Sequence, residues 1–149
     1  MARWTTDDFE SLSWHDCHVH GFRFGPLNEE CGSADLLFDI DFIEQWLCGD
    51  DGVCRFVLAP ATLTFHAATE LRLAVDFDAV QAGMAPFSLD GIEREQVQYT
   101  PRNSSYRWRL PVNWPSGEIT FESPGFTQVR RGETRVTTNQ RLTAAERVD

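Results

Sequence analysis

The sequence contains no lysine, no long apolar stretch and none of the short motifs that mark common enzymes. A transmembrane helix would need a run of about 18 apolar residues, and no such run occurs. Cys-x-x-Cys, Gly-x-Ser-x-Gly and a phosphate-binding glycine loop are all absent. These absences indicate no cofactor and no catalytic residues, and they favour a binding protein over an enzyme.

What is present is typical of one globular domain. The chain has 149 residues, of which 42% are hydrophobic and 24% charged. Since domains usually have about 100–200 residues, we expect a single domain with its own core. We place this domain at residues 1–131, because residues 132–149 carry only three sizeable apolar side chains, Val136, Leu142 and Val148. The sequence predicts that this last segment is a loosely ordered tail.

Alternation of apolar and polar residues dominates the pattern. Phe38, Ile40 and Phe42 alternate with Asp39 and Asp41, as in a strand with one buried and one solvated face. Several other segments alternate in the same way, with turn residues between them, and little of the sequence favours helix. We therefore expect a mostly β fold: a single-domain antiparallel β-sandwich or open barrel of about seven or eight short strands.

One of these segments predicts a hairpin. Tyr106, Trp108 and Leu110 alternate with Arg107 and Arg109. The sequence Asn-Trp-Pro-Ser-Gly that follows is typical of a turn into a second strand. We expect Trp108 to be buried and both arginines to be exposed.

The charge is strongly negative and unevenly distributed. The net charge is −10, and residues 1–54 hold twelve acidic and two basic side chains, whereas residues 100–149 hold five and eight. Part of this asymmetry should cancel through cross-strand arginine–carboxylate pairs. The remaining acidic surface disfavours nucleic acid and membranes and favours a basic protein as the partner. The candidate contact residues are Asp39, Asp41, Glu44, Asp50 and Asp51.

A His-x-His pair provides an alternative function. On an extended strand Asp16, His18 and His20 would share a face and could bind zinc or iron, as in a metal-dependent enzyme. Phe22 and Phe24 continue that face, which is more typical of a strand turning into the core. The sequence therefore predicts no metal site. A further alternative is a carrier of apolar small molecules, suggested by the 11 phenylalanines and 5 tryptophans, which could line a barrel interior.

The four cysteines bear on the compartment. The first fourteen residues lack the apolar stretch of a secretory signal, so we expect a cytoplasmic protein with reduced thiols. Cys48 and Cys54 flank Gly-Asp-Asp-Gly, which predicts a hairpin loop. This pair could form a disulfide in an oxidising compartment.

Four blocks of the sequence resemble a family of small uncharacterised bacterial proteins. The blocks are Ser13–Asp16, Phe38–Trp46, Ala59–Phe65 and Gly125–Gln128, and the resemblance covers about residues 11–130. It implies a bacterial origin and no particular activity. In size, acidity and β-rich pattern, the chain is also similar in type to immunity proteins that neutralise secreted bacterial toxins. That similarity implies an antagonist of a basic toxin.

Overall fold

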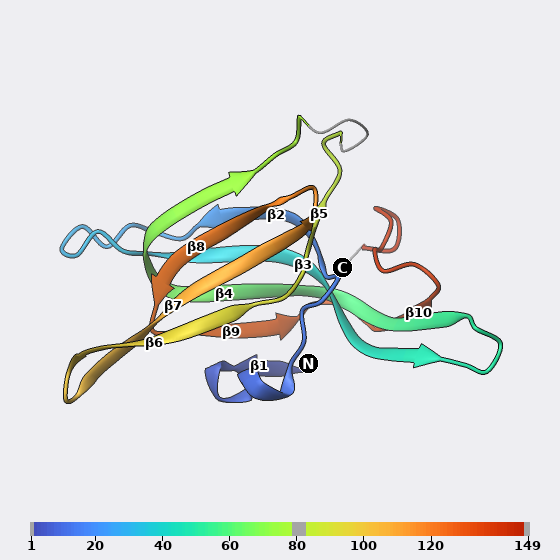
Figure 1. Cartoon of the computed structure of the whole chain (residues 1–149), viewed down its shortest axis with the longest axis horizontal. Coiled ribbons are helices and arrows are strands. Elements are labelled where there is room, and N and C mark those ends of the chain that lie inside the picture. The colour runs from blue at the N-terminus through green and yellow to red at the C-terminus, as the bar shows by residue number, and fades with distance from the viewer. Residues whose placement is uncertain (1, 79–82, 148–149) are drawn as a thin grey trace.

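The computed structural model describes residues 2–78 and 83–147, and nearly all of its regular structure is antiparallel strand. The expected mostly β, antiparallel fold is therefore confirmed (Figure 1). The elements are β1 (Arg3–Thr5), the 3-10 helix η1 (Thr6–Ser11), β2 (His18–Phe24), β3 (Ala34–Cys48), β4 (Cys54–Val75), β5 (Phe87–Leu89), β6 (Glu93–Thr100), β7 (Asn103–Trp114), β8 (Gly117–Ser123), β9 (Gly125–Arg130) and β10 (Arg135–Thr137).

The strands form one strongly curved sheet rather than a sandwich of two sheets. β4 pairs with β3 along one edge. Along its other edge it pairs first with β9, over residues 61–66, and then with β8, over residues 69–75. β8 pairs with β7, β7 with β5, β5 with β2, and β2 with β3, so the pairing returns to its start. The circuit is not a regular barrel, because β5 forms only two residue pairs with each neighbour. β3 and β4, with 15 and 22 residues, are also much longer than expected.

A sharp bend in β4 produces the curvature. Ala67 and Glu70 have φ values of 47° and 55°, in the left-handed region that a side chain normally disfavours. The register with β8 shifts between Thr69 and Arg72. Each such residue costs on the order of 1 kcal/mol, so the neighbouring strands must hold the bend in place.

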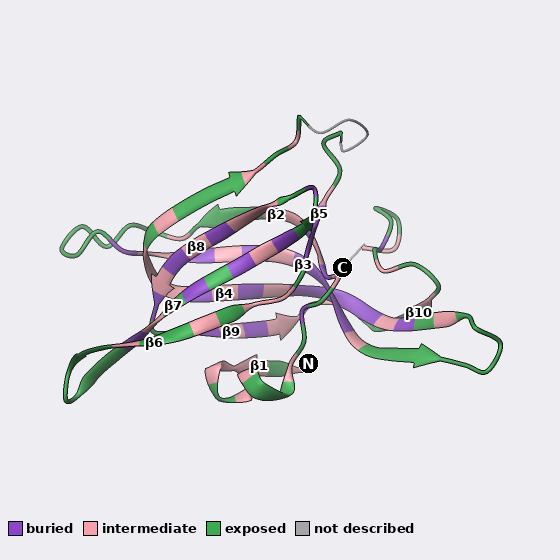
Figure 2. Ribbon diagram, viewed as in Figure 1, coloured by how far each residue is buried: buried purple, intermediate pink, exposed green. Residues whose placement is uncertain are grey.

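Aromatic side chains make up much of the core. Figure 2 shows buried residues along the central strands β4, β7 and β8. The ring of Phe65 lies 4.6 Å from that of Phe121 and 5.0 Å from that of Trp108. The Trp14 indole packs against Phe126 and donates a 2.7 Å hydrogen bond to the buried Gln128 side chain. The first and last of the four family-like blocks therefore meet in the core.

The hairpin prediction is confirmed. β7 and β8 pair antiparallel around a turn at Pro115 and Ser116. Trp108 is completely buried, and its indole donates to the Ser123 carbonyl. Arg107 and Arg109 are exposed, on the opposite face of β7.

Residues 132–147 of the segment expected to be a loosely ordered tail are mostly exposed but contact the sheet at several points, and residues 148 and 149 lie outside the described residues. β10 pairs with β4 in the register Val136 to Val57. Leu142 is buried in the core, and its backbone N–H donates a 2.9 Å hydrogen bond to Asp41. This segment covers a face of β3 that sequence alternation assigns to solvent.

Candidate functional site

The acidic pair on β3 is neutralised within the molecule. Asp41 is 0% exposed and accepts hydrogen bonds from His20 Nε2 at 2.7 Å, from the Leu142 N–H and from Arg147. Asp39 binds Arg147 and also Arg131, at 2.6 Å. The expectation that Asp41 projects into solvent is therefore wrong. Asp39 is paired with two arginines, although its side chain is 40% exposed.

Of the other three candidate contact residues, one is paired with an arginine and two are exposed. Glu44 is held by Arg130 through two hydrogen bonds of 2.7 and 2.5 Å, so it too has an internal partner. Asp50 and Asp51 are exposed at the loop between β3 and β4. The Asp51 carboxylate accepts only a local hydrogen bond from the Val53 N–H. Of the five candidates, the two loop residues are the ones left available to a partner.

The arginine partners are the part of this cluster that sequence reasoning did not assign. The excess of arginine in the last third predicted cross-strand pairing, but these pairs are of another kind. Arg131 and Arg147 lie outside the strands, and Arg130 on β9 pairs with a residue of β3, from which β4 separates it. The individual pairs join residues 86 to 108 positions apart, and no local pattern gives such pairings.

The structure separates the residues of the alternative metal site. Asp16 has a φ of 62° and lies before the strand, where it accepts hydrogen bonds from Asn113 and Gln140. The register of β2 shifts around His20, so His18 and His20 do not repeat regularly along one face. Within residues 2–78 and 83–147, no group of three or more His, Cys, Asp or Glu side chains is arranged to hold a metal ion. Phe22 and Phe24 are exposed, so their expected burial is also wrong.

The two histidines are neutral structural residues at pH 7. Burial, with the charge of the nearby Arg147 as the next cause, lowers the pKa of His20 to about 4. The negative charge of Asp39 opposes this lowering of the pKa. Burial is also the main cause of the lowered pKa of His18, with Arg141 as the next cause.

A two-stranded arm projects from the sheet at the end where β3 joins β4 (Figure 1). We define the hairpin arm as residues 44–57. It is closed by a disulfide between Cys48 and Cys54, which corrects the expectation that these thiols are reduced. Trp46, Leu47 and Val53 are exposed large apolar side chains on the arm. The arm therefore combines apolar and acidic groups on a covalently closed ribbon.

The base of the arm is hollowed. A cavity of about 340 Å³ is lined by side chains of β1, β3 and the segment that follows η1, including Trp4, Leu12, Phe42 and Trp46. The Trp46 ring packs edge-on against Phe56, 4.9 Å away. Trp46 is thus held in a defined position beside an apolar hollow.

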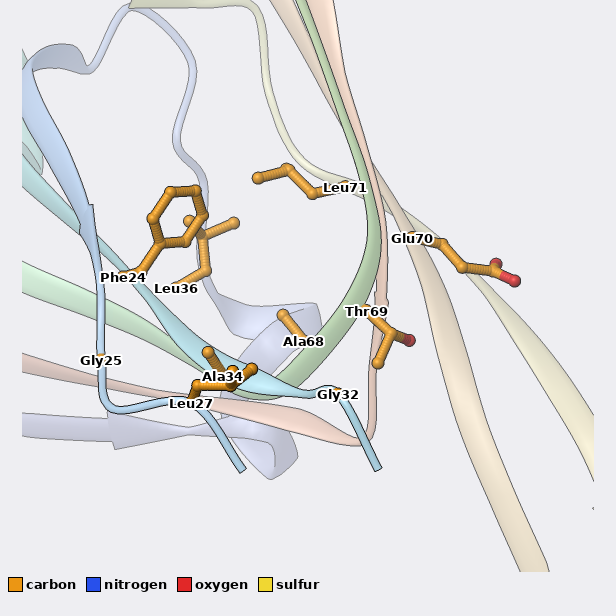
Figure 3. Close-up of a pocket in the computed structure, with 10 residues that line it drawn as sticks. All are labelled: Phe24, Gly25, Leu27, Gly32, Ala34, Leu36, Ala68, Thr69, Glu70 and Leu71. Atoms are coloured by element: carbon orange, nitrogen blue, oxygen red, sulfur yellow. The ribbon is translucent and has the colours of Figure 1, made fainter. Parts of the chain in front are cut away.

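A second hollow lies at the other end of the molecule, between β2, β3 and the bend of β4 (Figure 3). It has a volume of about 400 Å³. Phe24, Leu36, Ala68 and Leu71 point into it from three different strands. We call this hollow the bend pocket.

Comparison of the chain with protein-family models, curated proteins and solved structures gives no significant match. None of the helical segments in the described part of the chain has the length and apolar character that crossing a membrane requires.

Proposed function

We propose that this domain acts by binding a basic protein through the hairpin arm. The observation that carries the proposal is the exposure of Trp46, Leu47, Asp50 and Asp51 on one projecting, disulfide-closed hairpin. Buried aromatic anchors supply most of the energy of protein interfaces, and Trp is enriched among them. A closed ribbon also loses little conformational entropy when it binds.

Charge supports a basic partner. The net charge of −10 attracts a cationic surface over long range, and Asp50 and Asp51 extend that charge to the end of the arm. Asp39, Asp41 and Glu44 serve the fold instead, since their internal arginine partners hold them. The most specific form of the proposal is an immunity-type antagonist of a basic bacterial toxin. Its support is the acidic charge and the similarity in type.

The cysteines bear on the cellular compartment in which the protein acts. A cytoplasmic location, expected from the N-terminal residues, stays a prediction. The disulfide between Cys48 and Cys54 weighs against it, because disulfides persist mainly in oxidising compartments.

The test is affinity purification from an extract of the producing cells, with three versions of the tagged full chain. The wild type is compared with an arm variant, Asp50→Arg with Asp51→Arg, and with a control variant, Asp76→Arg with Asp78→Arg. The control pair matches the arm pair, because all four aspartates are exposed. In each pair one carboxylate, that of Asp51 or Asp76, accepts a hydrogen bond from a backbone N–H two residues later. We expect a basic protein to be retained by the wild type and the control variant and lost from the arm variant.

The purified partner then allows a kinetic test. The association rate should fall steeply with salt, and Trp46→Ala should raise the dissociation rate. Retention of the same proteins by the arm variant and the wild type would overturn the proposal. So would an association rate that is independent of salt.

A further inference from the structure

We propose that the bend pocket binds an uncharged, predominantly hydrocarbon small molecule. This site is separate from the hairpin arm and does not depend on the function proposed for the arm. The inference rests on an apolar inner surface that the protein leaves uncovered, on its preformed walls and on the charges around it.

The uncovered surface belongs to the inner face of the sheet. Phe22 pairs in register with Phe38, and Phe24 with Leu36. Directly opposed residues in an antiparallel pair lie on the same face, and Phe38 and Leu36 belong to the buried core. Yet Phe22 is 42% and Phe24 60% exposed. These two aromatic side chains therefore point toward the interior without being covered by it.

The opposite wall explains this exposure. Beyond residue 68, β4 no longer pairs with β3, and its bend carries Leu71 to the far side of the hollow. Figure 3 shows Leu71 facing Phe24 and Leu36 across the open space. The bend requires two side-chain-bearing residues in left-handed conformations, Ala67 and Glu70. Strained backbone of this kind is typical of ligand-binding sites.

The remaining wall is also fixed. The connection between β2 and β3 folds back on itself through hydrogen bonds from Gly25 N–H to Asp35 and from Asn28 N–H to Ser33, both 2.8 Å. It places Leu27 beside the hollow. A pocket of about 400 Å³ falls within the 300–1,000 Å³ range of small-molecule sites, which are mostly apolar and largely preformed.

The charges select the kind of ligand. None of the ten lining residues is basic, and Glu70 is the only charged one. Its side chain points away from the hollow (Figure 3), and its carboxylate lies 3.4 Å from Arg107. An anionic head group would find no counter-charge in the lining and would meet the repulsion of a strongly negative protein. A free fatty acid is therefore disfavoured, and an uncharged ester or ring system fits.

The experiment is a fluorescence titration of the full chain with Nile red, an uncharged apolar dye. Phe24→Glu and Leu27→Glu place a carboxylate in the pocket at positions that are 60% and 63% exposed, so both variants should fold. Val136→Glu is the matched control, because Val136 is 62% exposed but lies on β10, outside the pocket. Trp46→Ala controls for dye bound at the arm.

We expect saturable binding by the wild type, and unchanged binding by Val136→Glu and Trp46→Ala. Binding should weaken at least ~10-fold in both pocket variants, which corresponds to about 1.4 kcal/mol. Dodecyl acetate should displace the dye, and dodecanoate should do so at least ~10-fold less well.

Three results would overturn the proposal. The first is equal dye binding by the wild type and both pocket variants, provided that their unfolding transitions agree. The second is displacement by dodecanoate as effective as by the ester. The third is dye binding that appears only at concentrations where sedimentation shows dimers, because the hollow would then be an interface between two copies of the chain.

Discussion

Arg147 binds the buried carboxylate of Asp41, 106 positions earlier in the sequence. The guanidinium also binds Asp39, so one side chain near the C-terminus contacts two carboxylates on β3, and Arg131 supplies the second positive charge. Removing one partner of a buried ion pair is costly, because it leaves an uncompensated charge away from water. The C-terminal segment is therefore part of the domain rather than an appendage.

We predict that Arg147→Ala lowers the free energy of unfolding by about 3–5 kcal/mol, the usual cost of breaking a buried pair. Urea denaturation measures the effect. Arg102→Ala is the control, since Arg102 is exposed and substitutions at such sites change stability by about 0.5 kcal/mol or less. Adding Asp41→Asn to Arg147→Ala should restore part of the loss, because the buried charge is then absent. A loss no larger than that of the control would contradict the assigned pair.

The fold class could be predicted because alternation is a local property. Phe38 and Ile40 on one face of a strand, with Asp39 and Asp41 on the other, require no knowledge of distant residues. The bend of β4 could not be predicted in this way. Ala67 and Glu70 adopt left-handed conformations although neither is glycine, so their sequence gives no sign of it.

The candidate site was predicted only in part, for a related reason. Alternation places Asp41 opposite the core, and this is correct as far as β3 alone is concerned. Its burial comes from Leu142 and Arg147, which cover that face from the far end of the chain. A sequence with few apolar residues after position 131 gave no sign that this segment packs. The position of Asp50 and Asp51 at an exposed loop was predicted correctly because a hairpin loop is a local feature.

The alternation in β7 gives a second stability prediction. Trp108→Ala should lower the free energy of unfolding by about 3–5 kcal/mol, because it empties a fully buried site and leaves the Ser123 carbonyl without its donor. Arg109→Ala should cost less than about 1 kcal/mol, since its ion pairs with Glu93 and Glu118 are exposed. Chemical denaturation of the two variants checks the order. The reverse order would mean that the register of β7 is wrong.

The environment of His20 predicts a specific pH dependence. Its pKa falls from 6.5 in the unfolded chain to about 4 in the folded domain. Between these two values the unfolded chain binds a proton that the folded chain does not, so stability decreases as the pH falls through this window. At about 1.4 kcal/mol per pKa unit, the full effect is about 3.5 kcal/mol at most.

Replacement of His20 by glutamine isolates this contribution. Glutamine can still donate a hydrogen bond to Asp41 but does not titrate. We expect the free energy of unfolding of His20→Gln to fall less than that of the wild type between pH 7 and pH 4. Parallel pH profiles for the two proteins would show that His20 does not contribute.

The cysteines differ in their environments, and thiol titration should separate them. Cys31 is exposed, and hydrogen bonding to Ser33 lowers its pKa, so it should react rapidly in the native protein. Burial raises the pKa of Cys17 to about 12, so this thiol should react only after unfolding. In air-oxidised protein we expect one thiol to react natively, two after denaturation and four after reduction. Cys31→Ser should abolish the native reaction. Four reactive thiols in the denatured, unreduced sample would mean that Cys48 and Cys54 are not joined and that the hairpin arm is not covalently closed.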